Sequence, residues 1–480
     1  MFILSKKSSL NWLVGLAIAL LIHLFSGITT LAQSMTIIQV SGKPWGISTR
    51  YMGACEGNVN FDVRDLQDLG MNTYRIYGGM SRWEAEDDDG RYGWPSIAEI
   101  QANPAIINWD WWDKVMTNPP NRSDYWWSGS SEEIWQGNAR TIFGTLKQAG
   151  IKPVLTIRNV DNSWNPPWAL QLNPPRTEAD WNEWWEHIFA TVYWLNVRND
   201  YRVDEFEIHN EPDNRAQGWG GTQSDYFQLV KIAREAIDFV YRTYLPTRTY
   251  HIHAPVTVGD SSWPALALQE IPREFSSVNI HDYNRDISDY IGRVRGWMKD
   301  TVRENSDLWV SEWGTYENEY DTLPLALNLI QNAIRGSQPE SYIYGSHIFS
   351  LYDWGKTNGF KGLIGATGER RLSYYSLRMA IRVLQGGRTT FQSSTNNPDL
   401  MAIATQDEQN NLYLLVVNAG EKSHSVRTDL TALRTKGTGT MWEFSARVRD
   451  EVVGEVALDR GQASFEVPAL GAIAIAFPAA

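Results

Sequence analysis

Eight short runs rich in β-branched and aromatic residues alternate along the chain with longer stretches whose apolar residues recur at helical spacing. This alternation is typical of a parallel sheet covered by helices, and eight such units close the sheet into a barrel. The predicted strands lie near Gly46 to Gly53, Asn72 to Tyr77, Lys152 to Arg158, Glu205 to His209, Thr249 to Ala254, Ser277 to Tyr283, Leu308 to Ser311 and Tyr342 to Ser350. The sequence therefore predicts an α/β fold, a (β/α)8 TIM barrel.

A different pattern begins after Gly386. Short runs of alternating apolar and polar residues, separated by turn residues, include Asn411 to Gly420, Gly439 to Val448 and Gly471 to Phe477. These runs predict a C-terminal β-sandwich over residues 386–480, following a barrel over residues 33–385. They contain no motif for catalysis or metal binding, so we expect this domain to pack against the barrel.

The N-terminus has the pattern of an export signal. Lys6 and Lys7 precede an apolar stretch from Trp12 to about Phe25, and Thr30-Leu31-Ala32 supplies the small residues at which signal peptides are cut. Residues 1–32 are therefore predicted to be a signal peptide, and the mature chain to be secreted or periplasmic without stable membrane insertion. An uncleaved membrane anchor is the alternative, although the apolar stretch is short for a full span.

Tryptophan is abundant, with 23 in the chain. Eight of them fall between Gly78 and Gly137, in a stretch that also contains many Gly, Pro, Asn and Asp residues: Trp83, Trp94, Trp109, Trp111, Trp112, Trp126, Trp127 and Trp135. Aromatic rings offer flat apolar faces on which sugar rings can pack, so the cluster favours a carbohydrate groove. For any single tryptophan, a place in a small core of the loop itself is the stronger interpretation. The formal net charge of -13 argues against a nucleic-acid partner.

Two glutamates close strand-like runs about a hundred residues apart. Glu211 lies in the segment FEIHNEPD, from Phe206 to Asp213, and Glu312 lies in the segment LWVSEWGTY, from Leu308 to Tyr316. They follow the fourth and seventh predicted strands, and the carboxyl ends of barrel strands are where barrel enzymes keep their reactive groups. Taken singly, Glu211 could cap the next helix and Glu312 could be an ordinary loop carboxylate. Their joint positions favour a catalytic pair.

Other polar and aromatic residues fall at the same ends of the predicted strands. The candidates for substrate binding are Arg75 after strand two, Asn210 beside Glu211, His281 and Tyr283 after strand six, Trp313 beside Glu312, and Trp354 after strand eight. If Arg75 and Tyr283 point at Glu312, their charge and hydrogen bonding would hold that carboxylate ionised. The eight histidines show no close-spaced ligand pattern, so we expect no metal and no cofactor.

On these motifs the sequence resembles the clan A retaining glycoside hydrolases. The barrel followed by a β-domain looks most like glycoside hydrolase family 39 and its relatives, with families 5, 30 and 51 less similar. The resemblance implies that Glu211 is the general acid/base, Glu312 the nucleophile, Asn210 a contact to the sugar 2-hydroxyl and Trp354 the floor of the reactive subsite. His281 and Tyr283 match the usual partners on strand six.

The resemblance thus implies a retaining hydrolase of O-glycosidic bonds in an extracellular or cell-envelope polysaccharide or oligosaccharide. A retaining enzyme needs its two carboxyl groups about 5 to 5.5 Å apart, whereas an inverting enzyme keeps about 6.5 to 9.5 Å. Two alternatives stay open. A transglycosylase would use the same glutamate pair, and a barrel that only binds carbohydrate would keep the groove without turnover.

Overall fold

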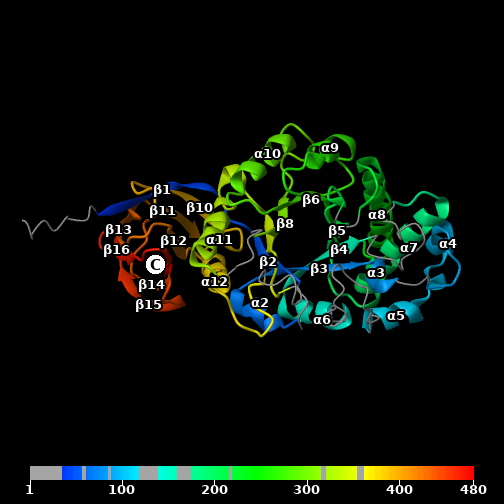
Figure 1. Cartoon of the computed structure of the whole chain (residues 1–480), viewed down its shortest axis with the longest axis horizontal. Coiled ribbons are helices and arrows are strands. Elements are labelled where there is room, and N and C mark those ends of the chain that lie inside the picture. The colour runs from blue at the N-terminus through cyan, green and yellow to red at the C-terminus, as the bar shows by residue number, and fades with distance from the viewer. Residues whose placement is uncertain are drawn as a thin grey trace, which may run out of the picture.

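The computed structural model describes residues 35–56, 61–84, 88–117, 139–158, 174–215, 219–314, 321–353 and 362–479. Within these ranges, parallel strands close into a barrel in which strand order follows chain order (Figure 1). The barrel strands are β2 (Tyr51–Cys55), β3 (Thr73–Gly79), β4 (Lys152–Arg158), β5 (Glu205–Ile208), β6 (His251–Val258), β7 (Ser277–Asp282), β8 (Leu308–Trp313) and β9 (Gly345–Ile348). The predicted (β/α)8 barrel is confirmed.

Helices connect the barrel strands and cover their outer face. They are α2 (Val63–Leu69), α6 (Ala139–Ala149), α7 (Glu178–Tyr193), α8 (Gln223–Tyr244), α9 (Trp263–Glu270), α10 (Ser288–Met298), α11 (Leu323–Arg335) and α12 (Leu372–Leu384), with η2 (Trp194–Arg198) and η4 (Pro339–Ser341) at the ends of connections. Thr177 and Thr222 begin α7 and α8 with capping boxes, in which the threonine hydroxyl accepts from the backbone three residues on. Local sequence therefore fixes where these two helices start.

An insertion between β3 and α6 adds α3 (Met80–Trp83), α4 (Ile97–Ala102), η1 (Pro104–Ile106) and α5 (Trp109–Thr117). Trp83 and Trp112 are completely buried there, and Trp109 and Trp111 pack against the same hydrophobic core. These four tryptophans thus belong to or pack against the main hydrophobic core, which includes the barrel, and not a separate small core of the loop. Trp126, Trp127 and Trp135 lie outside the described residues.

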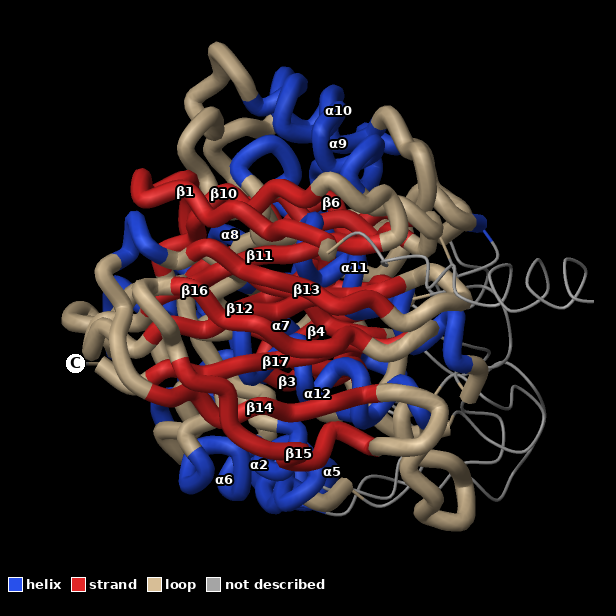
Figure 2. The backbone as a smooth tube through the Cα atoms, turned by 90° about the vertical axis from the view of Figure 1, so that its left-hand side faces the viewer, coloured by secondary structure: helices blue, strands red, loops and turns tan. Residues whose placement is uncertain are grey.

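The second domain is a nine-stranded sheet in the order β15-β14-β17-β12-β11-β10-β1-β13-β16 (Figure 2). Its strands are β1 (Thr36–Ile47), β10 (Thr389–Thr395), β11 (Leu400–Gln406), β12 (Leu412–Asn418), β13 (His424–Asp429), β14 (Thr438–Phe444), β15 (Arg449–Ala457), β16 (Gln462–Val467) and β17 (Gly471–Phe477), with η5 (Thr431–Leu433) after β13. The end strands β15 and β16 contact each other. The predicted β-sandwich is thus one continuous sheet that curls back on itself.

One strand of this sheet comes from the start of the chain. β1 pairs antiparallel with β10 and parallel with β13, and it lies beside them in Figure 1. The sequence predicts that residues 33–385 belong to the barrel and that the first barrel strand lies near Gly46 to Gly53. That barrel strand starts later, at Tyr51. The pairing of β1 joins residues more than 340 positions apart, so no local sequence pattern could indicate it.

The sheet packs against the barrel through one of its two apolar faces. Ile403, Leu415 and Val417 belong to the hydrophobic core that includes the barrel, whereas Ala404 and Leu414 belong to the separate core inside the curled sheet. This division follows from the two-residue period of strands. Helices α11 and α12 of the barrel supply the opposing surface (Figure 1). Among the described helices, none combines the length and apolar character needed to span a bilayer.

Candidate active site

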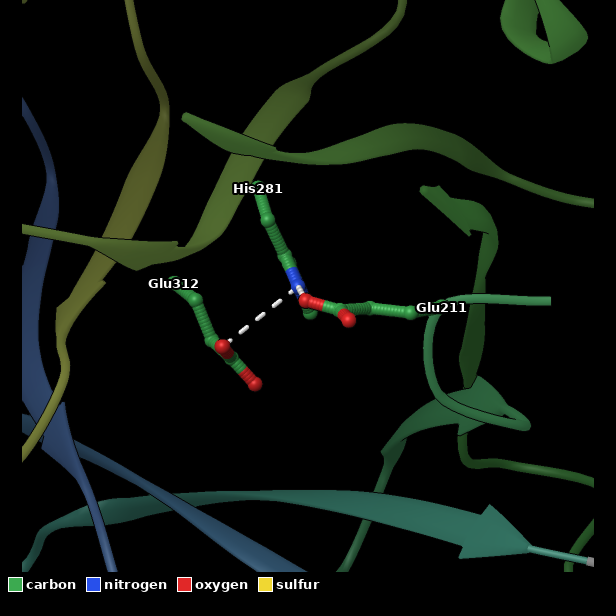
Figure 3. A group of neighbouring side chains, drawn as sticks. All are labelled: Glu211, His281 and Glu312. Atoms are coloured by element: carbon green, nitrogen blue, oxygen red, sulfur yellow. Dashed lines mark hydrogen bonds and ion pairs between the residues drawn. The ribbon is translucent and has the colours of Figure 1, made fainter. Parts of the chain in front are cut away.

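The barrel brings Glu211 and Glu312 together at the carboxyl ends of its strands (Figure 3). Glu211 follows β5, the fourth barrel strand, and Glu312 lies in β8, the seventh. Both side chains are buried. One carboxylate oxygen of each glutamate and one ring nitrogen of His281 all lie within 4.8 Å of one another. The two carboxyl groups are therefore close enough to act on a single bond.

Glu312 is surrounded by hydrogen-bond donors. Its Oε1 accepts from Arg75 Nη1 at 2.7 Å and from the Tyr77 hydroxyl, and its Oε2 accepts from the Tyr283 hydroxyl at 2.6 Å. Burial by itself raises the pKa of this carboxyl, but the charges of His281 and Arg75 and the two tyrosine hydrogen bonds outweigh burial and lower it. Glu312 is thus held ionised, as a nucleophile requires.

Glu211 has a different set of neighbours. Its Oε1 lies 2.8 Å from His281 Nδ1, and its Oε2 accepts from Asn214 Nδ2 at 3.0 Å. Its backbone is in the left-handed region, with φ of 45°, and its N–H donates to the Val256 carbonyl at 2.9 Å. This hydrogen bond to β6 fixes the direction in which the Glu211 side chain leaves the strand end.

His281 lies between the two carboxylates. The same Nδ1 that contacts Glu211 is 3.5 Å from Glu312 Oε2, as the dashed lines in Figure 3 show. Burial lowers the pKa of the imidazole, but Glu312 and Glu211 raise it by more, so its net direction is upward. A ring nitrogen placed in this way can share a proton with either carboxylate.

Arg75 on β3 links most of the site. Its Nε donates to Glu207 Oε2 at 2.7 Å, its Nη1 to Glu312 and Tyr77, and its Nη2 to Asn210 Oδ1 at 2.8 Å. Sequence reasoning selected Arg75 and Asn210 but missed Glu207. A charged residue inside a barrel strand, flanked by Phe206 and Ile208, was the available signal, because the two-residue period turns alternate side chains of such a strand inward.

The two tryptophans predicted to bind substrate have different outcomes. Trp313 is 4% exposed and belongs to the main hydrophobic core, so its predicted substrate contact stays a prediction. Trp354 lies outside the described residues. The other predicted substrate-binding residues, Arg75, Asn210, His281 and Tyr283, lie around the glutamate pair.

Glu211, His281 and Glu312 could geometrically offer three ligand atoms to a metal ion. The surroundings of Glu312 do not fit that use. Its two oxygens already accept hydrogen bonds from Arg75, Tyr77 and Tyr283, and a guanidinium 2.7 Å from the carboxylate repels a further cation. The donor set fits an acid and a nucleophile better than a metal centre.

Known proteins resemble the chain in sequence and in fold, although no family model matches it. The β-xylosidase of Caldicellulosiruptor saccharolyticus is 22% identical over 351 residues, which are 65% of this chain and 70% of that protein. The glucosidase of Croceicoccus marinus superposes with a TM-score of 0.66 at 12% identity, covering 93% of this chain and 99% of that one. The family 39 enzyme of Xanthomonas axonopodis pv. citri gives 0.64 at 13% identity, covering 94% and 99%.

The predicted likeness to the clan A glycoside hydrolases, family 39 and its relatives, is confirmed. The sequence match and the shared fold together support the expected class of enzyme, an O-glycoside hydrolase. The solved structures cover both the barrel and the β-domain, so the likeness extends beyond the barrel alone.

Proposed function

We propose that the chain is a retaining glycoside hydrolase in which Glu312 is the nucleophile and Glu211 the general acid/base. The observation that carries this proposal is the approach of the two carboxylates: one oxygen of Glu211 lies within 4.8 Å of one oxygen of Glu312. An approach of this kind between two carboxylate oxygens fits the short separation of a retaining enzyme, in which one carboxylate attacks directly. The two glutamates share His281 but differ in their other partners, which are Arg75, Tyr77 and Tyr283 for Glu312 and Asn214 for Glu211, and this difference supports the division of roles.

The first step forms a bond between a Glu312 oxygen and the anomeric carbon while the glycosidic C–O bond breaks. Glu211 gives its proton to the departing oxygen, and its own negative charge replaces the one that Glu312 loses. Arg75 and Asn210 form a linked pair beside Glu312, which suits contact with the sugar hydroxyl next to the anomeric carbon. In the second step, Glu211 takes a proton from water, and the resulting hydroxide displaces Glu312 with net retention.

The substrate class we propose is an extracellular or cell-envelope polysaccharide or oligosaccharide, met after export directed by residues 1–32. Aryl β-xylosides are the first small probes to use, because the sequence relative is named a β-xylosidase. A xylan-derived oligosaccharide series should follow.

The test replaces each glutamate by glutamine. Glu312→Gln should lose turnover by a factor of about 10⁴ or more, because no carboxylate remains to form the glycosyl-enzyme. Glu211→Gln should still form the intermediate from aryl glycosides with good leaving groups, since these need little protonation, and azide should accelerate its release as a glycosyl azide of retained configuration. Glu270→Gln, at an exposed position on α9, is the charge-matched control and should behave as the parent.

Near-normal turnover by Glu312→Gln or by Glu211→Gln on an unactivated oligosaccharide would refute the assignment. Product analysis with an added acceptor sugar separates hydrolysis from transglycosylation, because a transglycosylase would yield mainly the coupled product. A parent protein that binds these sugars without cleaving any of them would favour the binding barrel.

A further inference from the structure

Glu207 is a further buried carboxylate, beneath the glutamate pair. It lies on β5, its side chain is completely buried, and it does not contact Glu211 or Glu312 directly in any hydrogen bond of the described residues. Its Oε2 accepts from Arg75 Nε and from Thr156 Oγ1, both at 2.7 Å, and its Oε1 accepts from Asn279 Nδ2 at 2.7 Å. Burial raises its pKa, but Arg75 and the Thr156 hydrogen bond outweigh burial and lower it to about 2. Glu207 is therefore a fixed negative charge.

Arg75 is shared between this fixed charge and the nucleophile. Its Nε faces Glu207 and its Nη1 faces Glu312, each at 2.7 Å. The guanidinium is completely buried, so its single positive charge has these two carboxylates as its counter-ions and water contributes little. Only one of the two keeps its charge throughout the proposed reaction, because Glu312 becomes a neutral ester in the glycosyl-enzyme.

We propose that Glu207 is a positioning residue that serves as the permanent counter-ion of Arg75, so that negative charge can leave Glu312 as the glycosyl-enzyme forms. This inference rests on the function proposed above and deepens it. With Glu207 present, Arg75 stays paired while the Glu312–anomeric carbon bond forms and the proton of Glu211 passes to the leaving oxygen. Glu207 itself exchanges no proton and touches no substrate.

Loss of this charge should affect the two chemical steps unequally. With a neutral residue at position 207, Glu312 is the one anionic partner of Arg75 among the described residues. Arg75 then stabilises the free Glu312 carboxylate more than the transition state, in which that charge is dispersing. Glycosylation should slow. Deglycosylation regenerates the carboxylate beside Arg75, so it should not slow. A residue that only filled space would not separate the steps in this way.

Other titratable groups also face Glu207 and Glu312, and they are identical in the parent and in the variants at position 207. Those around Glu207 are His253 on β6, His281 on β7, His347 on β9 and Tyr226 on α8. Those around Glu312 are Cys55 on β2, Tyr77 on β3, His281 and Tyr283, with Glu211 opposite. Burial holds Cys55 and the tyrosines neutral by raising their pKa values well above normal. Among the ion pairs of the described residues, those of Arg75 with Glu207 and Glu312 are both 2.7 Å long, and His281 lies farther from Glu312, at 3.5 Å.

The experiment compares Glu207→Gln, Glu207→Asp and Thr156→Val in the full-length protein with an activated aryl glycoside. Because glycosylation slows, Glu207→Gln should lower kcat/KM by about 10- to 100-fold and abolish the pre-steady-state burst of aryl alcohol. The acid limb of the kcat/KM profile should move about one pH unit lower, because a negative charge near Glu312 has been removed. Glu207→Asp keeps the charge and should keep both the burst and the acid limb. Thr156→Val removes one hydrogen bond to the same carboxylate but no charge, and should keep the acid limb.

Melting temperatures of all variants are measured alongside. A Glu207→Gln enzyme with the parent's acid limb and burst would overturn the inference, as would a folded Glu207→Asp enzyme that lost its burst. The latter comparison stands even if Glu207→Gln does not fold. Labelling of Glu312 in the parent by a mechanism-based 2-fluoro glycoside tests the proposed function separately. An inactive, unlabelled parent would overturn that function, whereas labelled Glu312 with an unchanged Glu207→Gln profile would overturn only the counter-ion role.

Discussion

Asp450 connects the two domains, and its replacement by Asn should weaken their association measurably. The residue lies on β15, and its side chain is completely buried against helix α12 of the barrel. Arg378 Nε donates to Asp450 Oδ2 at 2.7 Å, and Arg382 donates to both carboxylate oxygens. One carboxylate thus balances two guanidinium groups from the other domain.

The size of the effect follows from the burial of the three groups. Removing one member of a buried, hydrogen-bonded charge pair destabilises a protein by about 3 to 5 kcal/mol. Arg378 and Arg382 are 21% and 24% exposed, so water can recover part of their solvation once the carboxylate is gone. Arg378 also keeps its bond to Asp68 Oδ2 at 3.0 Å. We therefore expect a loss near the lower limit, about 3 kcal/mol.

Urea unfolding and limited proteolysis at the connection between α12 and β10 measure this loss. The matched control is Asp260→Asn, which breaks another aspartate–arginine pair, with Arg293 at 2.6 Å, where the side chains are 61% and 48% exposed. That exposed pair should contribute less than about 1 kcal/mol. Equal destabilisation by the two variants would refute the reasoning, because burial would then not determine the strength of the contact.

Two further predictions concern the interior of the barrel domain. Trp112→Ala should reduce the free energy of unfolding by about 3 to 5 kcal/mol, because it leaves a cavity in the core. The KM for a small aryl glycoside should not change. A raised KM without lost stability would instead place this ring in the substrate groove. Burial of His347 lowers its pKa to about 3. Below about pH 6.5 the unfolded chain therefore binds a proton that the folded protein does not. The free energy of unfolding falls by about 1.4 kcal/mol per pH unit as the pH drops from about 6.5 toward 3. His347→Asn should therefore lose unfolding free energy less steeply than the parent between pH 6.5 and 4, and parallel curves would contradict this account.

The sequence by itself determined the barrel and the positions of its two principal glutamates. Strand and helix periods are local, and in a parallel barrel the order of strands in space is the order in the chain. Once eight units are recognised, a residue such as Glu211 or Glu312 at a strand's carboxyl end has a defined place at the mouth. Arg75, Asn210, His281 and Tyr283 could be placed near them by the same rule.

Only the tertiary structure decided how these residues pair and which strands join the second sheet. The hydrogen bond from Arg75 to Glu207 depends on the direction of each side chain inside the barrel and on the stagger of β3, β4 and β5. A sequence pattern does not determine either of these closely enough to predict a hydrogen bond. The use of β1 in the second sheet depends on pairing across more than 340 residues. Local periodicity sets where a strand forms, but the free energy of burying its faces against distant partners sets where that strand goes.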